Sequence, residues 1–290
     1  MEQKEHFHNN ITKTHDAWNK YQALGQRIKV AILDSGIGNH PILKPLKHYK
    51  INNGTLVLSE NPNIDWDHGT SIAGLIGGGK IELNEEGAGK ILGVAPECKI
   101  IDCQIVISKS TDVNPGLVVL AINNAIKEGV KVINCSYTFE RNDTVIAAID
   151  KALKAGIIFC CPVQNDGQLE FPASLDRSGM LVVEAIPKDG SFNGASVSAA
   201  VDIYVPIGKI YTIAANKNDY VSDFGGTSAA TAFVSGVAAL VLSANQDLTN
   251  IEVANIIKNS GTKDNGKSIL DASAAVEMAL SWNTSSPKAT

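Results

Sequence analysis

Six short runs of apolar, mainly β-branched residues recur along the chain, and polar or glycine-containing sequence follows each of them. Runs that are apolar on both faces are typical of strands in a parallel sheet that helices cover on both sides. The expected strands are residues 28–33, 99–107, 130–135, 157–161, 180–186 and 201–205.

The segments between these runs carry the residue types that begin and end helices. Asn114 and Pro115 begin one expected helix and Gly129 ends it, while Asn142 and Gly156 bound another. Strands that alternate with helices of this length imply right-handed crossovers. The pattern therefore predicts an α/β fold with a doubly wound, mostly parallel central sheet and helices on both faces.

No internal repeat, linker or break in composition divides the chain. Further helices are expected over residues 11–24, after the capping-box pair Thr249 and Glu252, and over residues 270–282. We expect a single domain over residues 1–290, with loose polar tails at 1–10 and 283–290.

Charge and cysteine content narrow the class of protein. The formal net charge of −5 does not favour nucleic-acid binding. We find no apolar run of bilayer-spanning length and no apolar signal core at the N-terminus. The five cysteines lie mostly in apolar runs and lack the spacing of metal ligands, which indicates buried, reduced thiols and no metal site. We expect a cytoplasmic protein that binds neither nucleic acid nor membrane.

Three polar residues are candidates for chemistry. Asp34 ends the first strand, and ligands of open parallel sheets bind at the carboxyl ends of strands. His68 lies at the entrance of an apolar helix, and Ser228 follows Gly225–Thr227 where a helix N-cap is expected. The helix after Ser228 is apolar nearly all round, which predicts burial in the core.

Each of these residues has an ordinary structural explanation when taken singly. Asp34 would form an Asx turn, His68 would lie on the surface, and Ser228 would cap a core helix. Together they supply the carboxylate, imidazole and hydroxyl that nucleophilic catalysis near neutral pH requires. Their order along the chain, Asp then His then Ser, is the order found in subtilisin.

Longer motifs around these residues resemble a known family. The three signature segments of the subtilisin-like serine proteases are similar to residues 30–36 (VAILDSG), 68–70 (HGT) and 226–230 (GTSAA). A linking motif of the family resembles residues 93–96 (GVAP), and the likeness runs over nearly the whole chain. The resemblance implies a subtilisin-like fold and a serine endopeptidase with the triad Asp34, His68 and Ser228.

The resemblance also implies where a peptide substrate would bind. The family's oxyanion asparagine, in an Asn-x-Gly turn, matches Asn165, and the strand end that pairs with an extended peptide matches residues 134–138. Residues 171–173 (FPA) resemble a segment with a cis proline near the specificity pocket. Candidate substrate contacts are Ser136, Tyr137, Thr138 and Gln164.

The chain departs from the family pattern at several of these positions. Ala229 replaces the usual Met after the serine, and residues 232–233 (AF) replace the usual Pro-His. Larger residues replace family glycines at Thr138 and Gln164, and Tyr137 replaces a leucine. These changes predict a narrower groove and a restricted set of substrates.

Catalysis by such a triad requires no cofactor. In relatives the loop after the histidine helix often binds structural calcium, and Asn84, Glu85 and Glu86 offer oxygens here without forming a ligand code. The expected partner is a protein or peptide substrate bound as an extended strand.

Two other classes of protein compete with the peptidase hypothesis. A catalytically silent peptide-binding module on the same fold would keep the triad residues but block access, for example through Tyr137. A nucleotide-binding α/β protein would need a glycine-rich loop after the first strand, and residues 34–41 contain no G-x-G-x-x-G.

Overall fold

The computed structural model describes residues 12–43, 45–60, 64–79, 93–108, 113–192, 199–215 and 220–282. The tails predicted at 1–10 and 283–290 lie outside these residues, as does the loop that carries Asn84, Glu85 and Glu86. The main feature is a 10-stranded sheet with the order β11-β12-β8-β7-β6-β5-β1-β4-β2-β3.

Six strands of this sheet confirm the runs expected from sequence. They are β1 (Lys29–Asp34), β4 (Lys99–Gln104), β5 (Val132–Asn134), β6 (Ile158–Pro162), β7 (Met180–Ile186) and β8 (Ile203–Pro206). Every pairing among them is parallel. The doubly wound, mostly parallel α/β sheet is thus confirmed.

Six further strands were not expected, and all are short or poorly buried. Four extend the sheet at its two ends: β2 (Lys47–Asn52), β3 (Thr55–Ser59), β11 (Thr262–Asp264) and β12 (Lys267–Ile269). The pairs β2–β3 and β11–β12 are antiparallel hairpins that form the edges. A separate antiparallel pair consists of β9 (Ile210–Ile213) and β10 (Tyr220–Phe224).

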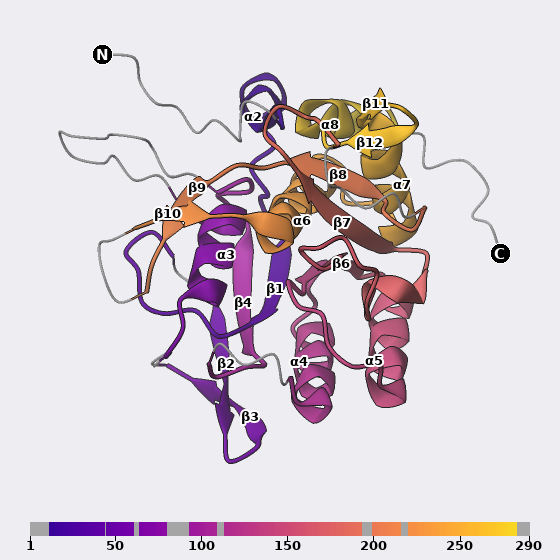
Figure 1. Cartoon of the computed structure of the whole chain (residues 1–290). Helices are drawn as coiled ribbons and strands as arrows, with labels where there is room; N and C mark the ends of the chain where they lie inside the picture. The colour runs from indigo at the N-terminus through magenta and orange to yellow at the C-terminus, as the bar shows by residue number, and fades with distance from the viewer. Residues whose placement is uncertain are drawn as a thin grey trace.

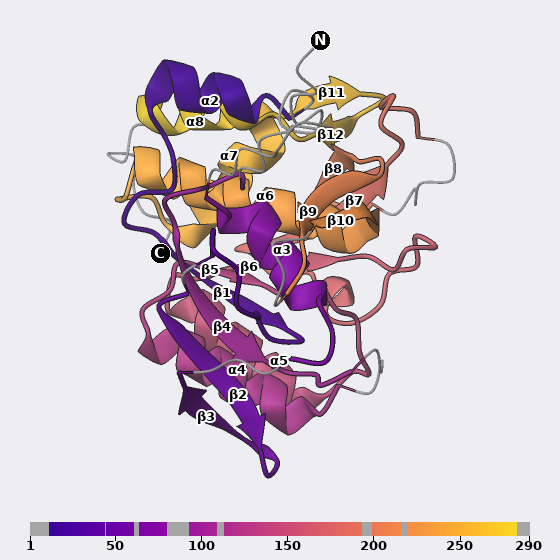
Figure 2. The ribbon, with the colours of Figure 1, turned by 90° about the vertical axis from the view of Figure 1, so that its left-hand side faces the viewer.

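Helices cover both faces of the sheet (Figures 1 and 2). One face carries α2 (Thr14–Tyr21), α3 (His68–Gly77), α6 (Gly226–Ala244), α7 (Asn250–Ser260) and α8 (Ala272–Ser281). The other face carries α4 (Pro115–Lys127) and α5 (Asp143–Lys154). A short 3₁₀ turn, η1, spans Ala173–Leu175.

Alternation of side chains along the strands produces two cores. Val30 and Ile32 of β1 point toward α6, whereas Ala31 and Leu33 point toward α4 and α5. All four residues are 0% exposed, which explains why β1 is apolar throughout. The helix caps expected from the sequence are present. The side chains of Asn114 and Asn142 accept hydrogen bonds from backbone N–H groups in the first turns of α4 and α5, and Thr249 and Glu252 form the capping box of α7.

Helix α6 corrects the expectation that no apolar segment has bilayer-spanning length. It has 19 residues and, among the described residues, is the one helix long and apolar enough to cross a membrane. In the structure 83% of that stretch is buried within the protein, so α6 is the central helix of one core.

Candidate active site

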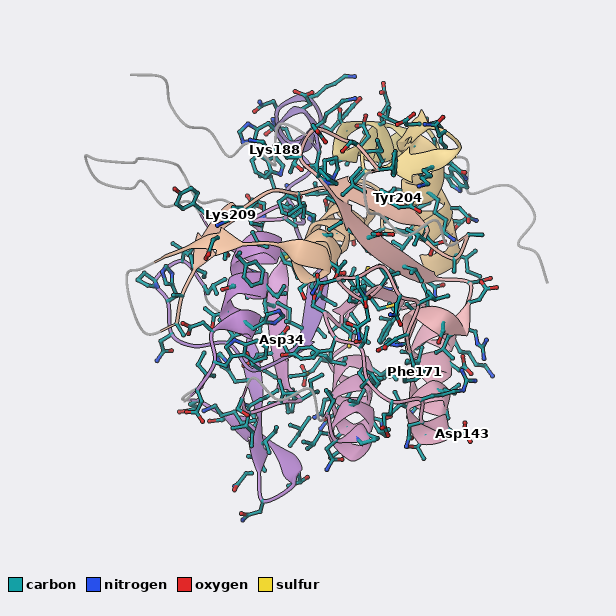
Figure 3. The ribbon with its side chains drawn as sticks, viewed as in Figure 1. Asp34, Asp143, Phe171, Lys188, Tyr204 and Lys209 are labelled. Carbon is teal, nitrogen blue, oxygen red and sulfur yellow. The ribbon has the colours of Figure 1, made fainter. Side chains whose placement is uncertain are left out.

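Asp34 and His68 meet at the carboxyl-end rim of the sheet. Asp34 is the last residue of β1 and His68 is the first residue of α3. The His68 Nδ1 atom lies 2.8 Å from Asp34 Oδ1 and 3.0 Å from Oδ2. Asp34, labelled in Figure 3, is fully buried. The carboxylate therefore holds the imidazole by its Nδ1 side, which leaves Nε2 for another partner.

The backbone around this pair explains why α3 can come so close to β1. The Ser35 N–H donates to Asp34 Oδ1 at 2.7 Å, while Ser35 Oγ donates to the Trp66 carbonyl and accepts from the Gly69 N–H. A Cβ at Gly69 would lie 2.5 Å from the Gly36 carbonyl oxygen and 3.1 Å from Asp34 Oδ1. Only glycine at position 69 allows this approach.

Three aromatic rings surround the His68 imidazole. Their centroids lie 4.8 Å away for Trp66, 5.5 Å for Tyr137 and 5.5 Å for Phe224. The resulting burial disfavours the charged imidazolium, but the negative charge and hydrogen bond of Asp34 outweigh it and raise the pKa of His68 above its ordinary value of 6.5. The Tyr137 hydroxyl is buried and has no hydrogen-bond partner in the described part of the chain, and burial raises its pKa.

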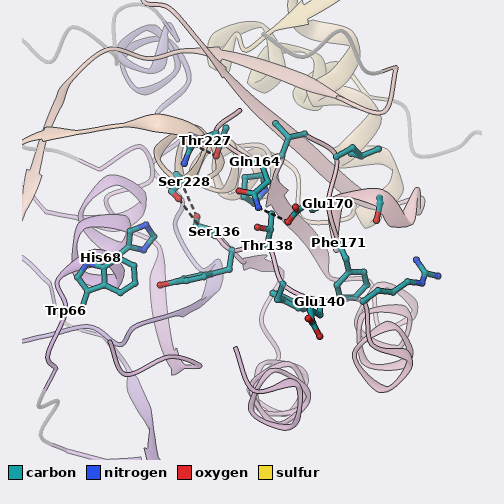
Figure 4. Close-up of a pocket in the computed structure, with 18 residues that line it drawn as sticks. Trp66, His68, Ser136, Thr138, Glu140, Gln164, Glu170, Phe171, Thr227 and Ser228 are labelled. Atoms are coloured by element: carbon teal, nitrogen blue, oxygen red, sulfur yellow. Dashed lines mark hydrogen bonds between the residues drawn. The ribbon is translucent and has the colours of Figure 1, made fainter. Parts of the chain in front are cut away.

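Ser228 lies in the first turn of α6, which corrects its expected position as an N-cap. The helix begins at Gly226, with Gly225 as N-cap and no side-chain cap bond. Ser228 Oγ donates to the Ser136 carbonyl at 3.3 Å, and no hydrogen bond joins Ser228 to His68 in the described structure (Figure 4). Both residues line the same pocket, so a change of the serine χ1 rotamer would direct Oγ elsewhere in that pocket.

Hydrogen bonds tie the start of α6 to the end of β5. Ser235 of α6 donates to the Asn134 side chain at 2.9 Å, and Asn134 Nδ2 donates to Ser136 Oγ at 3.0 Å. Ser136 Oγ in turn donates to the Ser228 carbonyl at 3.2 Å. Asn134, Ser136 and Ser235 are all buried, so this series of hydrogen bonds fixes the position of Ser228 relative to the sheet.

Asn165, the predicted oxyanion residue, lies beside the first turn of α6. Its Oδ1 accepts from the Thr227 N–H at 3.1 Å and from Thr227 Oγ1 at 3.2 Å. Because a backbone N–H can only donate, this contact identifies Oδ1 and assigns Nδ2 to the other side of the amide. Gly226 has φ +70, and a Cβ there would lie 2.5 Å from Asn165 Oδ1, so glycine is needed for the contact.

The four predicted substrate contacts all line one pocket with a volume of about 860 Å³ (Figure 4). Ser136, Tyr137, Thr138 and Gln164 share it with His68, Asn165 and Ser228. The expected cis peptide bond is present between Phe171 and Pro172.

Sequence reasoning missed three residues of this region. Trp66 and Phe224 contact the imidazole, and Glu170 lies in the pocket. Trp66 stands two positions before His68 and Glu170 directly precedes Phe171. Those short spacings were the only signal in the sequence.

The described residues contain no group of three or more His, Cys, Asp or Glu side chains placed to hold a metal ion. The calcium expectation concerned Asn84, Glu85 and Glu86, which are outside those residues.

Comparison with models of known protein families identifies the family of this chain. The subtilase family model matches residues 25–274, which is most of the chain. The chain belongs to the subtilase family.

Individual relatives show how far the similarity extends. "Subtilisin-like protease 1" of Plasmodium berghei is 28% identical over 282 residues, covering 81% of this chain and 46% of the relative. Subtilisin DY of Bacillus licheniformis is 29% identical over 270 residues, covering 87% of this chain and 92% of the relative. This subtilase thus spans less than two thirds of some curated relatives, the Plasmodium protein among them, and nearly all of others.

A solved structure confirms the subtilisin-like fold. The crystal structure of MycP1 from Mycobacterium smegmatis superposes with a TM-score of 0.74 at 22% identity. The match covers 94% of this chain and 84% of the other.

We predict that the His68 imidazole titrates above pH 6.5 in the wild-type protein and below it in Asp34→Asn. Removal of the carboxylate charge leaves burial as the main influence, and burial lowers the pKa of a histidine. Histidine Cε1–H resonances followed by NMR against pH would show the shift, with His68→Ala to assign the signal. Asp143→Asn, at the distant start of α5 (Figure 3), should leave the titration unchanged. Equal His68 titrations in wild type and Asp34→Asn would contradict the prediction.

Proposed function

We propose that this subtilase is a serine endopeptidase in which Asp34, His68 and Ser228 form the catalytic triad. The observation that carries the proposal is the buried Asp34–His68 pair opening into the pocket that Ser228 also lines. Membership of the subtilase family supports the same activity. The alternative, a silent peptide-binding module, is favoured by one observation: Ser228 Oγ is engaged by the Ser136 carbonyl.

The proposed reaction uses each residue in a defined step. Ser228 Oγ attacks the substrate carbonyl carbon while its proton passes to His68 Nε2, and Asp34 stabilises the imidazolium. His68 then gives the proton to the leaving amine as the C–N bond breaks and the acyl-enzyme forms. In the second half of the reaction, water attacks the ester carbonyl and gives its proton to His68. His68 then returns the proton to Ser228 Oγ as the ester bond breaks and the acid product leaves.

In the proposed mechanism two N–H groups would hold the oxyanion. The Ser228 N–H is in the first turn of α6, where N–H groups have no partner within the helix. Asn165 is oriented by Thr227 through Oδ1, so that its Nδ2 remains to donate. Preorganised donors of this kind stabilise charge that develops only in the transition state.

The substrate is proposed to be a protein or peptide chain that binds as an extended strand beside residues 136–138. Tyr137 packs edge-on against Trp66 and His68, and Gln164 is bonded to Glu170, so side chains occupy both walls of the pocket. This supports a restricted substrate set. Equal cleavage of many unrelated unfolded proteins would argue against it.

The first test is labelling by a fluorophosphonate, followed by intact-mass spectrometry. We expect one adduct on the wild type, none on Ser228→Ala, and much slower labelling of His68→Ala. Because the base must be neutral, the wild-type rate should rise with pH through the raised pKa of His68. Folded wild-type protein that takes no label at any pH would favour the binding-module alternative.

Asn165→Ala should lower kcat by about 10² to 10³-fold, the loss known for an oxyanion donor in subtilisin, with a smaller effect on KM. The matched control is Asp166→Asn in the same turn, which keeps an acceptor for the Gln168 N–H. Steady-state kinetics on one peptide substrate would compare the two. A similar, small effect of both variants would remove Asn165 from the oxyanion site.

We also propose a reducing compartment, such as the cytoplasm, as the site of action. All five cysteines are free and buried. Burial raises the pKa of the Cys98, Cys135 and Cys160 thiols to about 12, which suppresses the reactive thiolate. Alkylation of the protein from its native source, denatured without reductant, should add five labels, whereas a native disulfide would contradict the proposal.

A further inference from the structure

The pocket extends beyond Ser228 and Asn165 to a far end at Glu170 and Phe171, which Figure 4 shows beyond Gln164. Residues 136–141 and residues 162–165 line its two walls, and the Glu170 side chain at the far end is exposed to solvent. A substrate residue whose carbonyl lies against Ser228 and Asn165 would direct its side chain between these walls. The chemistry of the far end therefore bears on which side chain fits.

The far end is held rigidly in place. The Phe139 N–H donates to the Phe171 carbonyl at 3.0 Å, and the two buried rings pack edge-to-face with centroids 5.2 Å apart. The Ser174 N–H donates to the Glu170 carbonyl at 2.9 Å. Backbone and ring contacts thus fix the two residues on which the end of the pocket is built.

A carboxylate occupies this end. Glu170 Oε2 accepts from Gln164 Nε2 at 2.6 Å, and Figure 4 shows the Glu170 carboxylate turned toward Gln164 and Thr138. Gln164 is itself held in a turn by backbone bonds with Gly167 and Gln168. The contact with Gln164 uses one carboxylate oxygen and supplies no positive charge.

Glu170 forms no ion pair within the described chain. Glu140 and Arg141 also line the pocket, yet no described lysine or arginine lies within ion-pair distance of the Glu170 carboxylate. In Figure 4 the Glu140 carboxylate points away from Glu170. The Glu170 carboxylate is therefore not engaged by a cationic side chain of the described residues.

The geometry points to Glu170 as the residue that makes this enzyme selective for lysine or arginine at the position that supplies the scissile carbonyl. This rests on the proposed function, and it specifies the substrate class. The aliphatic stem of either side chain would run along Val163 and Phe171, and its cation would reach the carboxylate. A bound substrate excludes water from the pocket, which strengthens the ion pair relative to one on an open surface. An acidic side chain would be repelled.

The test compares kcat/KM on peptides that differ only at this position, carrying Lys, Arg, Met or Glu. We expect the wild type to cleave the Lys and Arg peptides at least about tenfold better than the Met peptide and to leave the Glu peptide nearly uncut. In Glu170→Gln the ratio of kcat/KM on the Lys and Arg peptides to kcat/KM on the Met peptide should fall about tenfold or more. Comparison of kcat/KM between the Lys and Arg peptides shows which of the two side chains is preferred.

The matched control is Asp166→Asn, which removes one negative charge from the neighbouring turn, outside the pocket lining. It should keep the wild-type preference. Equal losses of Glu170→Gln on all four peptides, or a wild type without preference for cations, would overturn the assignment.

Binding separates this inference from the proposed catalysis. The same peptides, fluorescently labelled, can be bound to Ser228→Ala and to Ser228→Ala/Glu170→Gln and followed by anisotropy. Tighter binding of Lys or Arg peptides that disappears in the double variant supports the role of Glu170 even if the wild type takes no fluorophosphonate. Affinities that are independent of the peptide would refute it even in an active enzyme.

Discussion

The contact between Asp34 and His68 is the interaction on which the rest of the site depends. A carboxylate that is 0% exposed is costly unless it is hydrogen-bonded and paired. Asp34 meets this requirement with the Ser35 N–H and the His68 ring. The ring reaches it only because Gly69 has no side chain, so the position of α3 follows from the needs of one buried charge.

Helix α6 imposes the second constraint. It is buried among the sheet, α3, α7 and α8, so it cannot shift without disturbing the core. The bonds from Ser235 through Asn134 to Ser136 connect its interior to the end of β5, and Gly226 lets Asn165 approach its first turn. The hydroxyl of Ser228 is therefore placed by a rigid helix, and the amide of Asn165, although it lies in a turn, is held against that helix by its bonds to Thr227.

The two sides of the pocket differ in how they are built. Near Ser228 the groups that would act on a peptide bond come from strand ends and a helix start, which any subtilase must provide in similar form. Farther along, the walls consist of side chains at positions where the chain departs from the family pattern, with Tyr137 against the imidazole and Gln164 against Glu170. In the proposed function, reaction type and substrate choice would therefore be carried by separate parts of one cavity.

Most of the fold and the reacting residues could be predicted from local sequence. The central strands are buried on both faces and carry continuous apolar runs, so β1 and its neighbours could be predicted from the sequence. The edge strands could not be predicted, because strands such as Thr262–Asp264 are short and exposed and leave no apolar pattern. The expected N-cap role of Ser228 was wrong, since whether a hydroxyl caps a helix or lies within its first turn depends on backbone angles at Gly225 and Gly226.

What the sequence by itself determined was the order of elements and the residue types that meet at the sheet's rim. Asp34 ends a strand, His68 and Ser228 lie in the first turns of helices, and Asn165 lies in the turn that follows β6, so their convergence follows from parallel topology. Only the tertiary structure decided what surrounds them. Trp66, Phe224 and Glu170 come from loops and from a second small sheet, and their contacts depend on how distant segments pack, which no local period in the sequence records.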